Sequence, residues 1–213
     1  MHHHYIEDGV FEERRNQKEA EQIAKQVADA IKRDKHVGVV AFSEEQLNCI
    51  WEQLNTSTRE LLQEKLDTNE AFFKALENVQ GDECDQLFIS FGYGRNNDGE
   101  FHLRFGPMNR TSGRKRLNVL LTRARESIHF FCSVKSTEFK LSDNESINLL
   151  RMWLQFSENH KDDSKLTFPY NLEPRVEGNK LIIRKVQNSF NSAQELVTLQ
   201  SVLEERGWEV EYE

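Results

Sequence analysis

Apolar and polar positions along the first part of the chain follow the periods of helices and of buried strands. Apolar residues at helical spacing predict an amphipathic helix over residues 17–33: Ala20, Ile23, Ala24, Val27, Ala28 and Ile31. Asn16 is a suitable N-cap for this helix, with Glu19 three residues further on. The run VGVVAF that follows His36 is apolar throughout, which predicts a strand buried in a parallel sheet.

Helices and strands continue to alternate after this strand. Ser43 is a predicted N-cap, and its helix would carry an inner face of Leu47, Ile50, Trp51, Leu54, Leu61 and Leu62. Residues 71–79 fit a helix or a strand, and we prefer a strand for their second half. The later elements are strands at 86–93, 101–104 and 127–134, and helices at 113–125 and from Asp143 or Asn144 to about His160. This alternation predicts an α/β sandwich with a mostly parallel sheet.

The composition changes after residue 160. Residues 161–175 are polar and contain two prolines, which is typical of a linker. A strand at 180–186, a helix at 192–206 and a strand at 208–212 are expected to follow. The prediction is therefore a main domain over residues 1–160, a linker over 161–175, and a small α/β appendage or the start of a truncated domain over 176–213.

Charge is distributed unevenly along the chain. The net charge of −8 argues weakly against a general nucleic-acid binder. Residues 101–125, however, contain seven Lys or Arg and no acid, so the rest of the chain carries −15. A basic island in an acidic protein favours a dedicated anion site, and the alternative is a solvated helix face. No apolar run approaches the roughly 20 residues that span a bilayer, which excludes a transmembrane segment.

Cysteine and histidine usage predicts neither disulfides nor a metal site. The three cysteines form no CxxC pair, which is typical of a reduced, cytoplasmic protein. His2, His3 and His4 are either a truncated tag or native residues. Nothing close to them in the sequence completes a metal site.

The tetrapeptide Gln80-Gly81-Asp82-Glu83 stands between two predicted strands. A loop at the carboxyl edge of a parallel sheet is where α/β domains place ligands. Gly81 would let a backbone approach closely, and Glu83 can accept hydrogen bonds from a sugar hydroxyl. Taken alone, the tetrapeptide is better explained as an ordinary polar turn.

The segment RKRLNVLLTRAR, residues 114–125, combines an apolar face with arginines. A single helix would bury Leu117, Leu120, Leu121 and Ala124. Arg116 and Arg123 would share a second face, and Arg125 would point elsewhere. The planar, permanently charged guanidinium of Arg123 suits a phosphoryl group in transfer. The alternative is a basic surface helix, but such helices usually carry acids at i+4 spacing, and none occurs here before Glu126.

Three motifs occur in an order that resembles a known family. GVVAFSEEQ (38–46), QGDECD (80–85) and KRLNVLLTRAR (115–125) resemble the GVVTPY…Q, QGxExD and RRLNVALTRAR motifs of superfamily 1 helicases, in the group that includes the nonsense-decay RNA helicase. Residues 92–110 resemble a bacterial branch of that group. The resemblance covers roughly residues 5–160. AFS stands where relatives often have TPY, so the tyrosine of that motif is absent.

The resemblance implies a function and a set of site residues. In these helicases two RecA-like domains clamp one ATP with Mg²⁺, and single-stranded nucleic acid lies across both. The chain would be the second RecA-like domain, a three-layer sandwich acting with the first RecA-like domain of the same polypeptide. Arg123 would be the catalytic arginine finger, and the strand would be DNA rather than RNA. The other implied residues bind nucleotide (Gln80, Gly81, Glu83, Arg116) or nucleic acid (Ser43, Asn78, Asn118, Thr122).

The sequence contains no GxxxxGK[ST] phosphate loop, so the isolated chain is expected to be inactive, with the Mg²⁺ ligands outside it. The alternative is a non-catalytic module that binds nucleic acid or a partner on the same fold. A native start near Met1 would favour this module, and a phosphate loop encoded upstream would favour the motor. A nucleotide-dependent oxidoreductase is disfavoured, because Gly92-Tyr93-Gly94 does not continue into GxGxxG.

Overall fold

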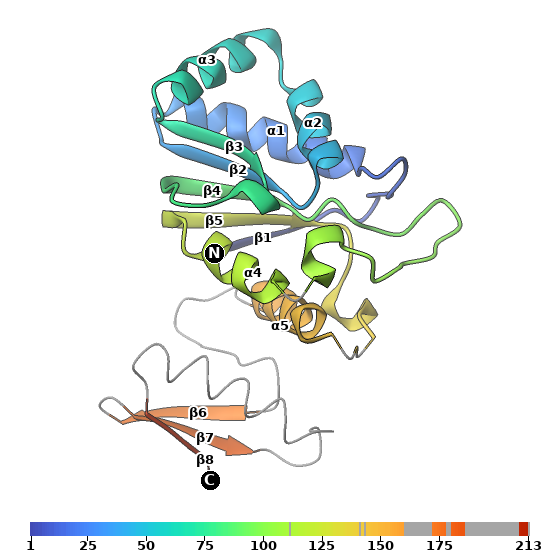
Figure 1. Cartoon of the computed structure of the whole chain (residues 1–213), viewed down its shortest axis with the longest axis vertical. Coiled ribbons are helices and arrows are strands. Elements are labelled where there is room, and N and C mark those ends of the chain that lie inside the picture. Colours follow the sequence, from blue (N-terminus) through green and yellow to red (C-terminus); the bar gives the residue numbers. More distant parts are fainter. Residues whose placement is uncertain are drawn as a thin grey trace. The chain divides into compact units, whose positions relative to one another are not determined.

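The computed structural model describes residues 1–110, 112–140, 142, 144–159, 172–177, 180–185 and 209–212. The chain divides into two compact units, Met1–Glu158 and Asn159–Glu213. In the first unit, five parallel strands form one sheet in the order β1-β5-β4-β2-β3. The strands are β1 (His2–Tyr5), β2 (Val37–Ala41), β3 (Ala71–Ala75), β4 (Cys84–Ser90) and β5 (Ala124–Cys132) (Figure 1).

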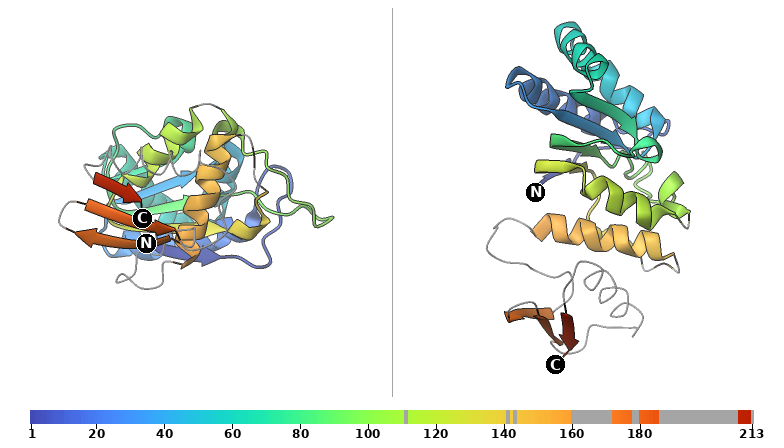
Figure 2. Two further views of the ribbon diagram at one scale, coloured as in Figure 1. Left: turned by 90° about the horizontal axis from the view of Figure 1, so that it is seen from below. Right: turned by 60° about the vertical axis from the view of Figure 1, so that its left-hand side comes forward.

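Helices cover both faces of this sheet (Figures 1 and 2). One layer holds α1 (Gln17–Lys32), α2 (Glu44–Gln53) and α3 (Thr56–Asp67), and the other holds α4 (Gly113–Leu121) and α5 (Glu145–Asn159). Short 3-10 turns are η1 (Leu76–Asn78), η2 (Gly106–Asn109) and η3 (Ser136–Glu138). Successive strand residues face opposite layers: Leu87 and Ile89 pack towards α4 and α5, and Phe88 towards α1. The predicted three-layer α/β sandwich with a parallel sheet is confirmed.

Both predicted N-caps are present. The Asn16 side chain accepts a hydrogen bond from the Glu19 amide at 3.2 Å, and Ser43 does the same for the Gln46 amide at 3.2 Å. β2 is buried at every position, as predicted for VGVVA. The Glu19 carboxylate, however, does not reach back to the cap but turns into the core.

Two predicted elements end earlier than expected. The helix after Ser43 stops at Gln53, because Asn55 caps a new helix by accepting from the Thr58 amide at 2.9 Å. Leu61, predicted to face inward, is therefore 42% exposed. The helix predicted over residues 113–125 ends at Leu121, and Ala124 is already part of β5.

Two strand predictions are wrong. In residues 71–79 the strand occupies the first half, and η1 occupies most of the second. No strand forms at residues 101–104. Phe101 and Phe105 instead pack with Phe139 in an aromatic cluster at the end of the sheet. These aromatic contacts, and not strand pairing, explain why apolar residues occur in this segment.

β1 was not predicted, because its three histidines do not form the apolar pattern that indicates a strand. It pairs in parallel with β5, and His2 to Tyr5 align with His129 to Cys132. The His4 ring stacks on Phe131 with centroids 4.4 Å apart. Burial lowers the pKa values of His3, His4 and His129 to about 4. These histidines are thus an integral edge of the sheet.

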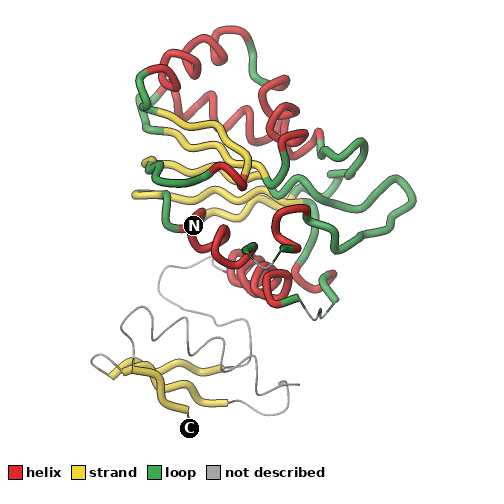
Figure 3. Tube along the Cα trace, viewed as in Figure 1, coloured by secondary structure: helices red, strands yellow, loops and turns green. Residues whose placement is uncertain are grey.

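The second unit contains a three-stranded sheet in the order β6-β7-β8 (Figure 3). Its strands are β6 (Leu172–Glu177), β7 (Lys180–Lys185) and β8 (Glu209–Tyr212), with β6 antiparallel and β8 parallel to β7. β6 takes in Leu172 to Arg175 of the predicted linker, and Pro174 is tolerated because β6 is an edge strand. The rest of that linker and the helix predicted at 192–206 lie outside the described residues. None of the described helices is long and apolar enough to cross a membrane.

Candidate functional site

Two of the sequence motifs meet at the amino ends of β4 and β5. Asp82 and Arg123 are 41 residues apart in sequence, yet the Arg123 Nη1 donates to the Asp82 carbonyl at 3.3 Å. Cys84 and Ala124, the first residues of the two strands, are partners in the parallel pairing. The Cys84 amide also donates to the Arg123 carbonyl at 3.0 Å. The register of the sheet itself therefore brings the Gln80–Glu83 loop against residues 122–125.

This loop lies at the edge of the sheet opposite to the predicted one. β3 ends at the carboxyl edge, and β4 runs parallel to it, so residues 76–83 must return to the amino edge before β4 begins. The prediction of a carboxyl-edge loop was therefore wrong. It failed because the sequence placed the loop between two strands without fixing at which strand end it lies.

Arg123 follows α4 and is held by three hydrogen bonds. Besides the contact with Asp82, its Nε donates to the Val119 carbonyl at 2.8 Å, and its Nη2 donates to Thr122 Oγ1 at 2.8 Å. The Val119 carbonyl lies in the last turn of α4, where carbonyls lack helical partners. The Arg123 side chain thus caps the helix, and its orientation is fixed without a ligand.

Glu83 and Arg125 form an exposed ion pair in the same cluster. Glu83 Oε2 accepts from Arg125 Nη2 at 2.8 Å and from Nε at 3.2 Å. The hydrogen bond and charge of Arg125 lower the pKa of Glu83, and Arg123 adds a smaller effect. Arg125 belongs to β5, so its predicted position on the far side of a helix is wrong. Both arginines lie beside the loop.

The loop's other residues define its shape. Gly81 has φ of +80°, a conformation that favours glycine. A Cβ at this position would meet no atom within 4 Å, so the glycine serves the backbone conformation rather than a close approach within the domain. The Asp82 carboxylate is held by Lys74 Nζ at 2.7 and 2.9 Å, and the Gln80 side chain is exposed.

Ser43, Asn78 and Arg116 lie away from this cluster. Ser43 follows β2 and Asn78 ends η1, so both lie at the carboxyl edge, where Asn78 Nδ2 donates to Glu44 Oε1 at 3.1 Å. Arg116 contacts Glu77, the neighbour of Asn78, at 3.5 Å. The helix does not extend far enough for Arg116 and Arg123 to share a face, and that prediction was wrong.

Asn118 and Thr122 belong to α4 and its C-cap. Asn118 is partly buried within the helix. The Thr122 hydroxyl donates to the Val119 carbonyl at 2.9 Å and accepts from Arg123. Thr122 is therefore placed to orient the arginine.

A buried polar network that was not predicted from the sequence lies at the carboxyl ends of β4 and β5. Glu19 is fully buried, and its Oε2 accepts from Ser90 Oγ and from the Gly92 amide, both at 2.7 Å. Its Oε1 accepts from Ser133 Oγ at 3.2 Å. Burial raises the pKa of Glu19 to about 8, against the opposing effect of these donors. Glu19 lies four residues before the predicted core residue Ile23, so both lie on the same face of α1. This spacing was the signal in the sequence that Glu19 would be buried.

Two amides complete this network. Gln46 Nε2 donates to Ser90 Oγ at 3.0 Å, and its Oε1 accepts from the Asn16 amide at 2.6 Å. Asn16 Nδ2 donates to Ser133 Oγ at 2.8 Å. Each serine hydroxyl accepts from an amide, so it can donate its own proton to the ionised Glu19 carboxylate. The network ties α1 and α2 to the ends of the central strands.

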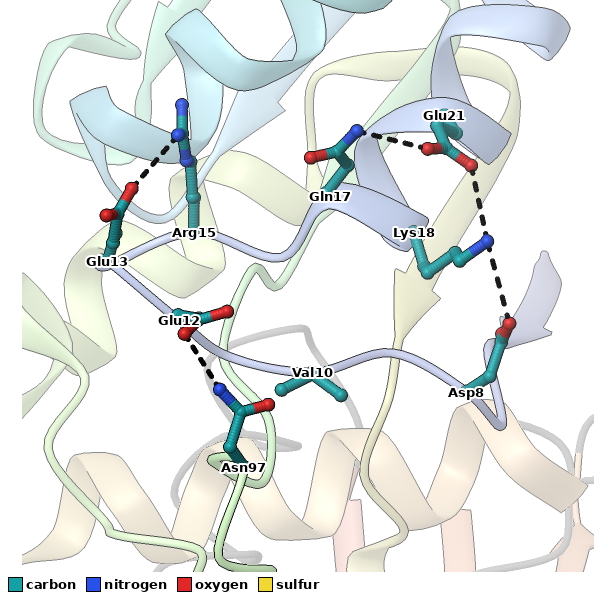
Figure 4. A pocket seen from close by; sticks show the side chains of 9 residues that line it. All are labelled: Asp8, Val10, Glu12, Glu13, Arg15, Gln17, Lys18, Glu21 and Asn97. Atoms are coloured by element: carbon teal, nitrogen blue, oxygen red, sulfur yellow. Dashed lines mark hydrogen bonds and ion pairs between the residues drawn. The ribbon is translucent and has the colours of Figure 1, made fainter.

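An open pocket of about 520 Å³ lies beside the start of α1 (Figure 4). Its charged side chains pair with one another: Lys18 lies 3.8 Å from both Asp8 and Glu21, and Arg15 lies 3.1 Å from Glu13. None of the predicted site residues lines it. Within the described residues, no three His, Cys, Asp or Glu side chains gather as a metal site.

Comparison with known proteins places this geometry in a family. Residues 3–135 match the family model described as an AAA domain. An uncharacterized ATP-dependent helicase of Mycoplasma pneumoniae is 32% identical over 152 residues, which are 66% of this chain and 13% of that protein. An uncharacterized ATP-dependent helicase of Mycoplasma genitalium is 29% identical over 154 residues, 68% of this chain and 13% of that protein.

The chain spans about 13% of the length of these curated relatives. The region that matches the family model runs from within β1 to just beyond β5, and so contains nearly all of the five-stranded sheet together with the cluster around Arg123. The chain therefore belongs to the AAA domain family.

Proposed function

We propose that this domain is the second motor domain of a superfamily 1 helicase, and that it completes an ATP site whose phosphate loop lies on another domain. The observation that carries the proposal is the fixed guanidinium of Arg123, held by Val119, Thr122 and Asp82 against the Gln80–Glu83 loop. The names of the two relatives, both ATP-dependent helicases, support it.

In this proposal Arg123 acts on the γ-phosphate of ATP with Mg²⁺, which the first RecA-like domain of the same polypeptide holds. A charge fixed beforehand stabilises the transition state without reorganisation at the moment of reaction. The contact of Nη1 with Asp82 is the longest of the three, at 3.3 Å. It is the contact that a phosphate oxygen replaces most readily, while Nε and Nη2 keep the side chain in place.

Glu83 would contact the ribose or phosphate region of the nucleotide. It has to leave Arg125 to do so, and exposed ion pairs contribute little to stability, so this exchange is easy. Gln80 and Gly81 give the loop its shape. The resemblance assigns Ser43, Asn78, Asn118 and Thr122 to single-stranded DNA. Ser43 and Asn78, at one edge, suit that role better than Thr122, whose hydroxyl is engaged with Arg123.

The test compares two forms of the protein. The isolated chain should show no ATP turnover with or without single-stranded DNA, because its sequence lacks the phosphate loop. A polypeptide that joins this domain to its phosphate-loop domain should hydrolyse ATP and be stimulated by the strand. Steady phosphate release by the isolated chain, abolished by Arg123→Ala, would contradict the proposal.

A non-catalytic binding module is the second candidate, and the missing phosphate loop favours it equally. This alternative predicts that hydrolysis by the joined polypeptide is the same with and without this domain. If hydrolysis is lost when this domain is removed and returns when the domain is added back, the motor function is supported and the binding module is excluded.

A further inference from the structure

We infer that Arg110 and Arg116 form a site for one phosphate of a single strand, and that the Glu77 carboxylate occupies this site when no strand is bound. The inference rests on the proposed function, because it specifies part of the strand surface, and it assigns Arg116 to the strand rather than to the nucleotide that the resemblance implies. Arg110 Nη1 and Arg116 Nη1 both approach the same atom, Glu77 Oε1, at 3.4 and 3.5 Å. Two guanidiniums from different segments thus converge on a single oxygen of an oxyanion.

The carboxylate is an imperfect occupant of this site. Charge-assisted hydrogen bonds to carboxylates are ordinarily about 2.7–2.9 Å long, and both contacts here are longer. A phosphodiester offers two charged oxygens, so each guanidinium can take its own partner. The Arg110 side chain is 67% exposed and that of Glu77 is 40% exposed, so an incoming phosphate has access.

The position of the pair is anchored and continuous with the candidate strand residues. The Arg110 carbonyl accepts from the Gly113 amide at 2.8 Å, which holds its backbone against the start of α4. Glu77 belongs to η1, as does Asn78, whose amide contacts Glu44. The site therefore lies at the carboxyl edge, at the end of α4 opposite to Arg123.

The Tyr93 hydroxyl is a neutral donor close enough for the charge of Glu77 to affect its pKa. The Tyr93 ring packs edge-on against Phe91 and Phe105 and is not free to stack on a base. Burial raises the pKa of its hydroxyl to about 12, and the charge of Glu77 adds to this, so the hydroxyl stays a donor. Gly106 has φ of +48°, and a Cβ there would come within 3.3 Å of the Tyr93 oxygen. The absence of a side chain leaves this oxygen uncrowded.

Strand binding at this surface is consequently an exchange, in which a phosphate replaces the Glu77 carboxylate. Removing the charge of Glu77 should then strengthen binding rather than weaken it. A residue that contacted the strand directly would give the opposite result. This reversal of sign makes the inference testable with the chain alone.

The experiment is a titration of a fluorescent oligodeoxythymidylate with the chain, at several salt concentrations. Glu77→Gln should bind up to about fivefold more tightly at low salt, the upper range for releasing an exposed ion pair. The slope of log K against log salt should steepen by about 0.7, the value for one more phosphate on a single strand. Between roughly 50 and 200 mM salt this amounts to a further loss of about 2.6-fold.

Glu60→Gln is the matched control. Glu60 lies on α3, is exposed and, within the described part of the chain, has no ion pair or hydrogen bond from its side chain. It changes the net charge equally and should leave affinity nearly unchanged. Adding Arg110→Gln and Arg116→Gln to Glu77→Gln should abolish the gain, and inorganic phosphate should compete with the strand for Glu77→Gln more effectively than chloride at equal ionic strength.

Three results would overturn the inference: equal gains for Glu60→Gln and Glu77→Gln, no gain for Glu77→Gln, or a gain that persists when uncharged methylphosphonates replace the phosphates. None of them bears on hydrolysis by the joined polypeptide. Failure here is therefore distinguishable from failure of the proposed motor function.

Discussion

Two glutamates at opposite ends of the parallel sheet have their pKa values shifted in opposite directions. At the amino ends of β4 and β5, Glu83 is 56% exposed, and its pairing with Arg125 lowers its pKa. At the carboxyl ends, Glu19 is fully buried, and loss of water raises its pKa to about 8. Exposed partners can be exchanged for a ligand at little cost, whereas buried ones cannot.

This difference indicates a division of roles. The buried network of Asn16, Gln46, Ser90 and Ser133 around Glu19 fixes the ends of the central strands against α1 and α2. The exposed end keeps charged groups where a second domain can reach them. We therefore expect mutations in the buried network around Glu19 to change stability, and mutations of the exposed charged residues to change ligand binding or turnover.

The largest expected change in stability follows from Glu19→Ala. It leaves the Ser90 hydroxyl, the Gly92 amide and the Ser133 hydroxyl without their acceptor in the core. We expect a loss of about 3 kcal/mol in the free energy of unfolding, because unsatisfied buried donors are costly. Urea unfolding measures it, with Glu83→Ala as the control at the exposed end. Equal losses for both variants would break the comparison.

The pH dependence of stability should have a maximum near pH 6.5. The raised pKa of Glu19, about 8 against 4.5, means that the folded state holds one more proton between these values, so Glu19 makes stability fall as pH rises. The lowered pKa values of His3, His4 and His129, about 4 against 6.5, make stability rise with pH in that window. The three histidines together outweigh Glu19 below pH 6.5, and their effect fades above it, where Glu19 dominates.

Glu19→Gln separates these contributions. It should remove the decline in stability between pH 6.5 and 8 and retain the rise below pH 6.5, as measured by urea midpoints at each pH. A decline that persists in this variant would show that the buried carboxyl group is not its source.

The smallest effect is expected for Glu83→Gln in the joined polypeptide. It should raise the KM for ATP with a smaller effect on kcat, because the lost contacts act on bound nucleotide and transition state alike. Steady-state kinetics over a range of ATP concentrations test it. An unchanged KM would remove Glu83 from the nucleotide site.

Local patterns predicted those features of the fold that depend on neighbours in sequence. The caps Asn16 and Ser43 and the buried strand β2 are of this kind. The end of α4 at Leu121 was missed, because Ala124 fits a helical leucine face as well as a strand paired with Cys84. That pairing is between segments far apart in the chain, and periodicity carries no information about it.

The candidate site shows the same limit. The motifs predicted Arg123 and Glu83 as candidate site residues, but they did not predict the contact of Arg123 with Asp82 or the pairing of Glu83 with Arg125. Both depend on the register between β4 and β5. Glu19 went unrecognised as a core residue because a carboxylate is buried only when donors from other strands surround it, and those donors are distant in sequence.

The most direct test of the central claim is kcat for ATP hydrolysis by the joined polypeptide, compared between Arg123→Ala and Arg125→Ala. Arg123→Ala should lower kcat by about 10³–10⁵ while nucleotide binding persists, the range for an arginine finger. Arg123→Lys should recover little, because an ammonium cannot reproduce the planar fork. Arg125→Ala should retain kcat, since the exposed Arg125 guanidinium, unlike that of Arg123, is not held in place by the end of α4. An active Arg123→Ala enzyme beside an inactive Arg125→Ala enzyme would contradict the account.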